Sequence, residues 1–155
     1  MTDEKTATFL VTSADDESAV LSDVEDAQVH TLSENPGVEE GDVLEATVAP
    51  EPPMNVTYSV VDVEARKQIP VEATNESPTQ QAREMAAGLD VGELETTERA
   101  GVGEVHVLRV PEDGVEDTVE DVRTDEQTVA RAARIGIERV EIRAGDDFVS
   151  VRYLP

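Results

Sequence analysis

The residues of this sequence that could do chemistry are few: two histidines, several runs of adjacent acids and one group of arginines. His30 and His106 each lie in a β-type stretch, and neither has a partner at the spacing of metal ligands. As general bases they would need an orienting acid and a nucleophile within hydrogen-bond reach, and the sequence singles out neither. We therefore predict packed or surface histidines and expect no catalytic residue, cofactor or metal.

The adjacent acids could in principle hold a hard cation. They occur at Asp15–Asp16–Glu17, Glu112–Asp113 and Asp146–Asp147, and none has the ligand spacing of a calcium-binding loop. Because the chain has 36 acidic residues, such runs arise by composition alone. Gly101–Val102–Gly103 lacks the third glycine of a phosphate-binding loop and lies between two expected strands rather than before a helix. We predict solvated turns at all four places.

The arginines are concentrated near the end of the chain. From Gln127 to Pro155 there are five arginines against four acids, a charge of +1, so the rest of the chain carries −24 minus 1, or −25. The stretch 139–144 alternates apolar and charged residues with period two, and Gly145–Asp146 is typical of a two-residue hairpin loop. The sequence thus predicts a closing hairpin with an apolar face and a charged face.

A two-residue loop predicts the cross-strand pairs of this hairpin. On the apolar face Ile142 and Val140 would lie opposite Val149 and Val151. On the other face Arg139 would lie opposite Arg152, and Arg143 opposite Phe148. Like charges opposite one another are unfavourable unless something negative approaches them. Three sources remain open: the acidic first half of the chain, a protein partner, or single-stranded nucleic acid stacked on Phe148.

A helix must precede this hairpin to cover its apolar face. Thr124 is a suitable N-cap, and Gln127 three residues later completes a capping box. Small residues and a valine recur at helical spacing from Val129 to Gly136, so the helix can approach a sheet closely.

The first half of the chain reads as a series of short strands. Alternating, β-branched stretches separated by turn residues predict strands at 6–12, 18–22, 27–32, 43–49 and 56–64, with a short edge piece at 67–71. This even spacing predicts a small antiparallel β-barrel over residues 6–72, which resembles the oligonucleotide/oligosaccharide-binding (OB) fold in pattern.

The second half mixes helices and strands. After a polar linker at 72–76, Ser77–Pro78 is typical of a helix start, and the expected order is α, β, β, α, α, β, β. A four-stranded, mostly antiparallel sheet with helices on one side satisfies that order. We therefore predict an α+β protein in which the barrel is followed by an α/β two-layer sandwich over residues 77–155.

The composition constrains the environment. A net charge of −24, with only two lysines and no cysteine, resembles the proteins of extremely halophilic archaea and excludes disulfides and thiolate sites. No apolar run is long enough for a membrane span, and the segment that begins with Met1 and ends with Lys5 lacks a signal-peptide pattern. We expect a cytoplasmic protein that requires salt for stability.

Two stretches, GVGEVHVLRV (101–110) and RAARIGIERVEIRAGDDFVSVRYLP (131–155), resemble a small uncharacterised family of haloarchaeal proteins described as a domain of unknown function. The resemblance implies no activity. We expect a non-catalytic intracellular adaptor or accessory module with a protein partner, and with nucleic acid as a less favoured one. The expected contacts are Pro52, Pro53 and Met54 at the barrel mouth, and Arg139, Arg143, Phe148 and Arg152.

An alternative function is a small-molecule or nucleotide sensor, in which the barrel encloses a ligand. His30 and Tyr58 would then be its polar contacts. A second alternative is a module that binds single-stranded nucleic acid. The sequence gives no expectation for the oligomeric state.

Overall fold

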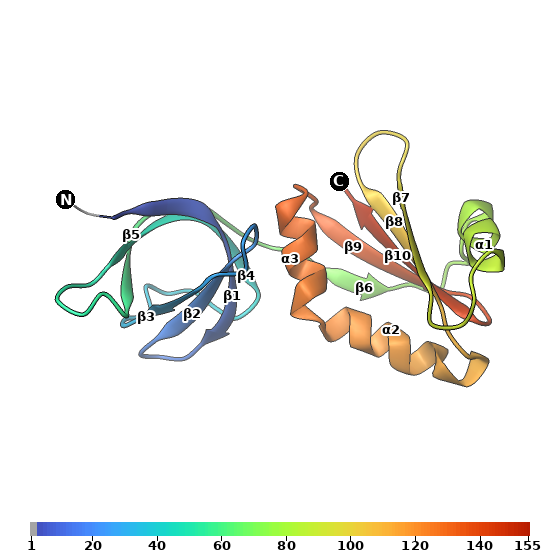
Figure 1. Ribbon diagram of the computed structural model, residues 1–155, viewed down its shortest axis with the longest axis horizontal. Coiled ribbons are helices and arrows are strands. Elements are labelled where there is room, and N and C mark those ends of the chain that lie inside the picture. The colour runs from blue at the N-terminus through green and yellow to red at the C-terminus, as the bar shows by residue number, and fades with distance from the viewer. Residues whose placement is uncertain (1–2) are drawn as a thin grey trace. The chain divides into compact units, whose positions relative to one another are not determined.

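The computed structural model describes residues 3–155, and their contacts divide the chain into two compact units. The segment that was expected to lack a signal-peptide pattern begins with Met1 and Thr2. These two residues lie outside the described part of the chain. The first unit comprises the described residues up to Ile69 together with Val129–Arg134. The second comprises Pro70–Thr128 and Ile135–Pro155. Figure 1 shows the barrel of the first unit and the sheet of the second.

The first unit is built on a closed five-stranded barrel, as the sequence predicts. Its strands follow the order β1-β2-β3-β5-β4 around the barrel, and β4 pairs with β1 to complete the ring. All the pairs are antiparallel except that of β3 with β5, which is parallel. The strands are β1 (Lys5–Ala14), β2 (Ala19–Asp23), β3 (Val29–Leu32), β4 (Asp42–Pro50) and β5 (Tyr58–Gln68).

Side chains fill the interior of the barrel. Phe9, Leu21, Leu32 and Leu44, from four different strands, are all 0% exposed. Leu21 and Leu32 alternate along their strands with more exposed residues, because successive side chains of a strand point to opposite faces. The barrel therefore has a packed core.

The second unit contains a five-stranded sheet, so the prediction of four strands is wrong. The order is β6-β9-β10-β8-β7, and the additional strand β6 pairs in parallel with β9. β6 lies within the stretch expected to end the barrel and begin a linker. The strands are β6 (Val71–Ala73), β7 (Leu94–Glu98), β8 (Glu104–Arg109), β9 (Arg139–Ala144) and β10 (Phe148–Leu154).

Helices cover both faces of this sheet, which corrects the expectation of a two-layer sandwich with helices on one side. Ala82 and Ala86 of α1 pack on Val107 and Phe148. Ile142 and Ala144 point to the opposite face, where α2 lies. The helices are α1 (Gln80–Ala87), α2 (Val115–Thr124) and α3 (Glu126–Arg134), and a short 3-10 helix η1 (Glu112–Gly114) precedes α2.

Both predicted helix N-caps are wrong by one or two residues. Thr79, not Ser77, accepts a hydrogen bond from the backbone N–H of Ala82 and caps α1. Asp125, not Thr124, accepts a hydrogen bond from the backbone N–H of Gln127 at the start of α3. Thr124 instead ends α2.

The closing hairpin has the predicted faces but not the predicted pairs. Gly145 N–H donates to the carbonyl of Phe148 over 2.9 Å, so the two-residue loop is Asp146–Asp147, one position later than predicted. As a result Ala144 lies opposite Val149, and each residue of β9 pairs two positions further along β10 than expected. A shift of two residues keeps every side chain on its face, because the side-chain period of a strand is two.

No helix among the described residues, 3 to 155, combines the length and the apolar character that crossing a membrane requires.

Candidate functional site

The three arginines of the closing hairpin converge on one carboxylate. Arg152 lies opposite Glu141, and its Nη1 donates to Glu141 Oε1 over 2.8 Å. Arg143 Nε donates to the same oxygen over 2.5 Å, and Arg139 Nη1 is 3.9 Å from Oε2. Arg139 lies opposite Leu154, so the predicted pair of opposed arginines is wrong. The negative charge that the arginines were expected to need is supplied by Glu141, within the hairpin itself.

A second carboxylate completes this cluster. Arg143 Nη2 donates to Glu76 over 2.6 Å, and Nη1 donates to the carbonyl of Ser77 over 3.3 Å. Burial alone would raise the pKa of Glu141. Its hydrogen bonds to Arg143 and Arg152 outweigh this effect, so the pKa lies below the ordinary value. We interpret the role of the cluster as structural, because it holds the hairpin and the segment that leads into α1 in place.

Phe148 does not share the surroundings of these arginines. Only 5% of it is exposed, and it packs on Ala82, Ala86 and Val107 under α1. Beside it, Arg109 donates to the carbonyls of Ala86 and Leu89 and to the carboxylate of Asp147. These bonds satisfy backbone acceptors at the C-terminal end of α1. A base could therefore stack on Phe148 only if α1 moved away.

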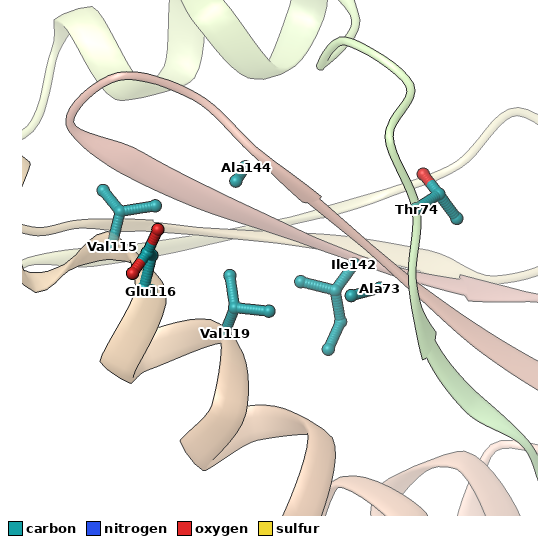
Figure 2. A pocket seen from close by; sticks show the side chains of 7 residues that line it. All are labelled: Ala73, Thr74, Val115, Glu116, Val119, Ile142 and Ala144. Atoms are coloured by element: carbon teal, nitrogen blue, oxygen red, sulfur yellow. The ribbon is translucent and has the colours of Figure 1, made fainter.

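The second unit has an apolar pocket on its other face, between α2 and the β6–β9 side of the sheet (Figure 2). Its volume is about 230 Å³. Figure 2 shows side chains of α2 and β9 facing each other across the pocket, with the end of β6 at one side. The lining residues are Ala73, Thr74, Val115, Glu116, Val119, Ile142 and Ala144.

Polar groups occupy only the margin of this pocket. Glu116 is exposed and lies in the first turn of α2, and Thr74 follows the last residue of β6. Glu112 and Asp113 in η1 and Asp117 in α2 add three exposed carboxylates next to Glu116. Carboxylates are favourable at a helix N-terminus, but Glu116, which lines the pocket, also gives it an acidic rim. An apolar cavity with an acidic rim suits a group that combines an apolar body with a positive charge.

His30 and Tyr58 come together inside the barrel, although the sequence separates them. Their ring centroids are 4.7 Å apart, and the His30 centroid is 5.3 Å from that of Phe9, both in edge-to-face arrangements. Burial lowers the pKa of His30, so the ring is neutral at neutral pH. Its Nδ1 is buried without a hydrogen-bond partner among the described residues.

The loop after β4 carries Pro52, Pro53 and Met54, and all three are exposed. The peptide bond between the two prolines is cis. Met54 is 75% exposed and Val56 is 68% exposed, so the loop presents apolar side chains to solvent.

His106 has a partner that the sequence analysis missed. Its Nε2 is 2.8 Å from a carboxylate oxygen of Glu104, and its ring lies against Tyr153 with the centroids 4.8 Å apart. The signal was present, because residues two apart on a strand share a face. No group of three or more acidic or histidine side chains within residues 3–155 is arranged to hold a metal ion.

The apolar pocket was also missed. Val115 and Val119 at helical spacing could have indicated an apolar stripe on α2. The other wall depends on β6, whose pairing with β9 joins residues far apart in the sequence.

Comparison with known proteins gives one match. No curated protein matches the chain. No solved structure matches it either. The model of the Family of unknown function DUF5812 matches residues 5–144, which is most of the chain. The expected resemblance to an uncharacterised family is confirmed, and the chain belongs to the family DUF5812.

Proposed function

We propose that this chain is a non-catalytic binding module whose partner is a protein. The pocket beside α2 carries the proposal, and it would receive an apolar side chain from a basic segment of that partner. Val115, Val119 and Ile142 provide the apolar walls. Glu116 at the rim of the pocket, with the exposed Glu112, Asp113 and Asp117 nearby in the chain, would attract neighbouring lysines or arginines of the partner.

The size of the pocket favours a side chain over a free ligand. Its volume of about 230 Å³ is below the roughly 300–1,000 Å³ that is typical of small-molecule sites. The barrel interior offers less room for a ligand, because large apolar side chains fill it. For these reasons a sensor that encloses a ligand near His30 and Tyr58 ranks below a protein-binding module.

The outer surface of the barrel also favours a protein partner. Its strand order, with β3 parallel to β5, is that of an OB fold, in which the faces of β2 and β3 and the neighbouring loops form the binding surface. Here the outward residues are Val20 and Ser22 on β2 and Val29 and Thr31 on β3. This surface has neither the aromatic side chains nor the cations with which OB folds hold single strands. Exposed Val29, Met54 and Val56 suit apolar contacts with a protein instead.

Selection from a random peptide display library tests the proposal. Selection is performed at the lowest salt concentration at which circular dichroism shows the intact fold, so that charge effects are not screened. We expect the selected peptides to contain an apolar residue flanked by lysine or arginine. NMR titration with one of them should shift the amide signals of Ala73, Thr74, Ile142 and Ala144.

Two variants on the same helix locate the site. Glu116→Lys reverses a charge on the pocket rim, and Asp121→Lys makes the same change at an exposed position outside the pocket lining. We expect Glu116→Lys to abolish the preference for basic flanks and Asp121→Lys to retain it. Equal effects of the two variants, or signal shifts away from α2 and β9, would contradict the proposal.

A further inference from the structure

Strand β7 ends the sheet of the second unit, and its outer edge carries backbone groups that β8 does not use. Arg109 N–H donates to the carbonyl of Glu93, and Arg99 N–H donates to the carbonyl of Gly103, so the odd-numbered residues bond to β8. In an antiparallel pair the residues between them point their N–H and C=O groups the other way. Leu94, Thr96 and Glu98 therefore present these groups at the open edge.

This edge lacks most of the features that usually prevent strands from pairing. Such features are very short strands, proline, charged side chains (lysine above all) and β-bulges, and of these β7 has only the charges of Glu95 and Glu98. The edge strand at the other side of the sheet has two of them, because β6 has three residues and follows Pro70. β7 has five residues in continuous register with β8, contains neither proline nor lysine, and leaves Leu94 57% exposed. This difference between the two edges of the sheet favours a partner strand at the β7 edge.

We propose that a second copy of this chain covers it, with the two β7 strands antiparallel about Thr96. In this register Thr96 faces Thr96 of the second copy, and Leu94 faces its Glu98. The outward N–H and C=O groups of these residues then bond each other across the two-fold axis. The two five-stranded sheets become one continuous sheet.

Charge complementarity selects this register. Pairing about Thr96 sets Glu93 of each copy opposite Arg99 of the other, on one face of the joined sheet, which gives two cross-strand ion pairs. Pairing about Leu94 would set Glu93 opposite Glu95, and pairing about Glu95 or Glu98 would set identical carboxylates opposite each other. Pairing about Thr97 would place Leu94 opposite Ala100, outside the strand. Arg99 Nη1 already donates to the carbonyl of Val102, which orders the side chain beside the edge.

The absence of cysteine makes a direct test simple, because a single introduced cysteine can form a disulfide only between two copies. In the proposed dimer the two Thr96 residues lie opposite each other, within the Cα separation that a disulfide requires. We expect oxidised Thr96→Cys to convert largely to a covalent dimer. Thr31→Cys, at an exposed position on β3, is the control and should remain mostly monomeric.

The native chain is tested by light scattering during size-exclusion chromatography, which should give twice the mass of one chain. Thr96→Pro removes an outward N–H without removing a bond to β8, so it should give a folded monomer. Arg99→Glu should weaken the dimer, and the exchange Glu93→Arg with Arg99→Glu should restore it. A native monomer, or a dimer that Thr96→Pro and Arg99→Glu both leave intact, would overturn the proposal. This inference does not depend on the pocket beside α2.

Discussion

Arg152 lies directly across from Glu141 on the neighbouring strand, and the two side chains are joined by a hydrogen bond of 2.8 Å. Only 18% of the Arg152 side chain and 13% of the Glu141 side chain are exposed. The same Glu141 oxygen also accepts from Arg143, so two guanidinium groups that have little access to water share one carboxylate.

Replacing this carboxylate should therefore destabilise the second unit. Glu141→Gln keeps the shape of the side chain but leaves Arg152 without its charged acceptor and Arg143 with Glu76 alone. We expect a loss of about 2 kcal/mol in the free energy of unfolding, the typical magnitude for hydrogen bonds to charged groups. Urea denaturation followed by circular dichroism measures it. Glu95→Gln on the exposed strand β7 is the control, and equal stability of the two variants would contradict the structural interpretation.

The same contact predicts a dependence on pH. The pKa of Glu141 is lower in the folded protein than its ordinary value, so the folded state binds the proton more weakly than the unfolded state. The stabilisation is present above the unfolded pKa of about 4.3 and disappears as the pH falls through the folded pKa. We expect the difference in stability between native protein and Glu141→Gln to shrink over that range. A difference that stays constant down to about pH 3 would be inconsistent with the lowered pKa.

Position 145 should require glycine, because there is no room there for a larger side chain. A Cβ atom at this position would lie 2.2 Å from Cε1 of Phe148, whose ring is held under α1. Gly145→Ala should therefore cost about 2 kcal/mol through overpacking, because Phe148 must leave its place. At Gly88 an added Cβ would meet its nearest atom at an ordinary 3.6 Å, so Gly88→Ala is the matched control and should change stability much less. Thermal denaturation compares the two variants.

Salt should stabilise the whole chain. The net charge is −24, and the Debye length grows from about 3 Å at 1 M salt to about 30 Å at 0.01 M, so repulsion among carboxylates increases as salt is removed. We expect the melting temperature to fall by roughly 10 °C or more between these conditions, which corresponds to about 2 kcal/mol for a small domain. An unchanged circular dichroism melting curve in dilute buffer would refute the expectation.

Local patterns predicted most of the elements. Period-two alternation and turn residues located the five barrel strands, and the order of helices and strands after Ser77 is the one observed. The faces of the closing hairpin were also predicted, because alternation fixes the face of a side chain whatever the length of the turn. The predicted pairs failed because they depended on the position of the turn. The bond from Gly145 to Phe148 places the two-residue loop at Asp146–Asp147, one position later than the glycine suggested.

The candidate pocket could not be predicted, because it depends on contacts between distant segments. Val71–Ala73 is too short and too close to Pro70 to indicate a strand, and its pairing with β9 is visible only in three dimensions. The arginine cluster was misinterpreted for a different reason. Arg139, Glu141 and Arg143 alternate on one face of a single strand, so the counter-charge was already present in the sequence next to the arginines.

The parallel pairing of β6 with β9 affects how the chain acquires its structure during synthesis. Val71 leaves the ribosome well before its partner Val140, and the barrel strands are complete by Gln68. The first sheet can therefore close while the second still lacks its inner strands β9 and β10, which follow later in the chain. Until β9 has been synthesised, β6 lacks the strand it pairs with, and a fragment that starts after Ala73 would leave the same edge of β9 uncovered.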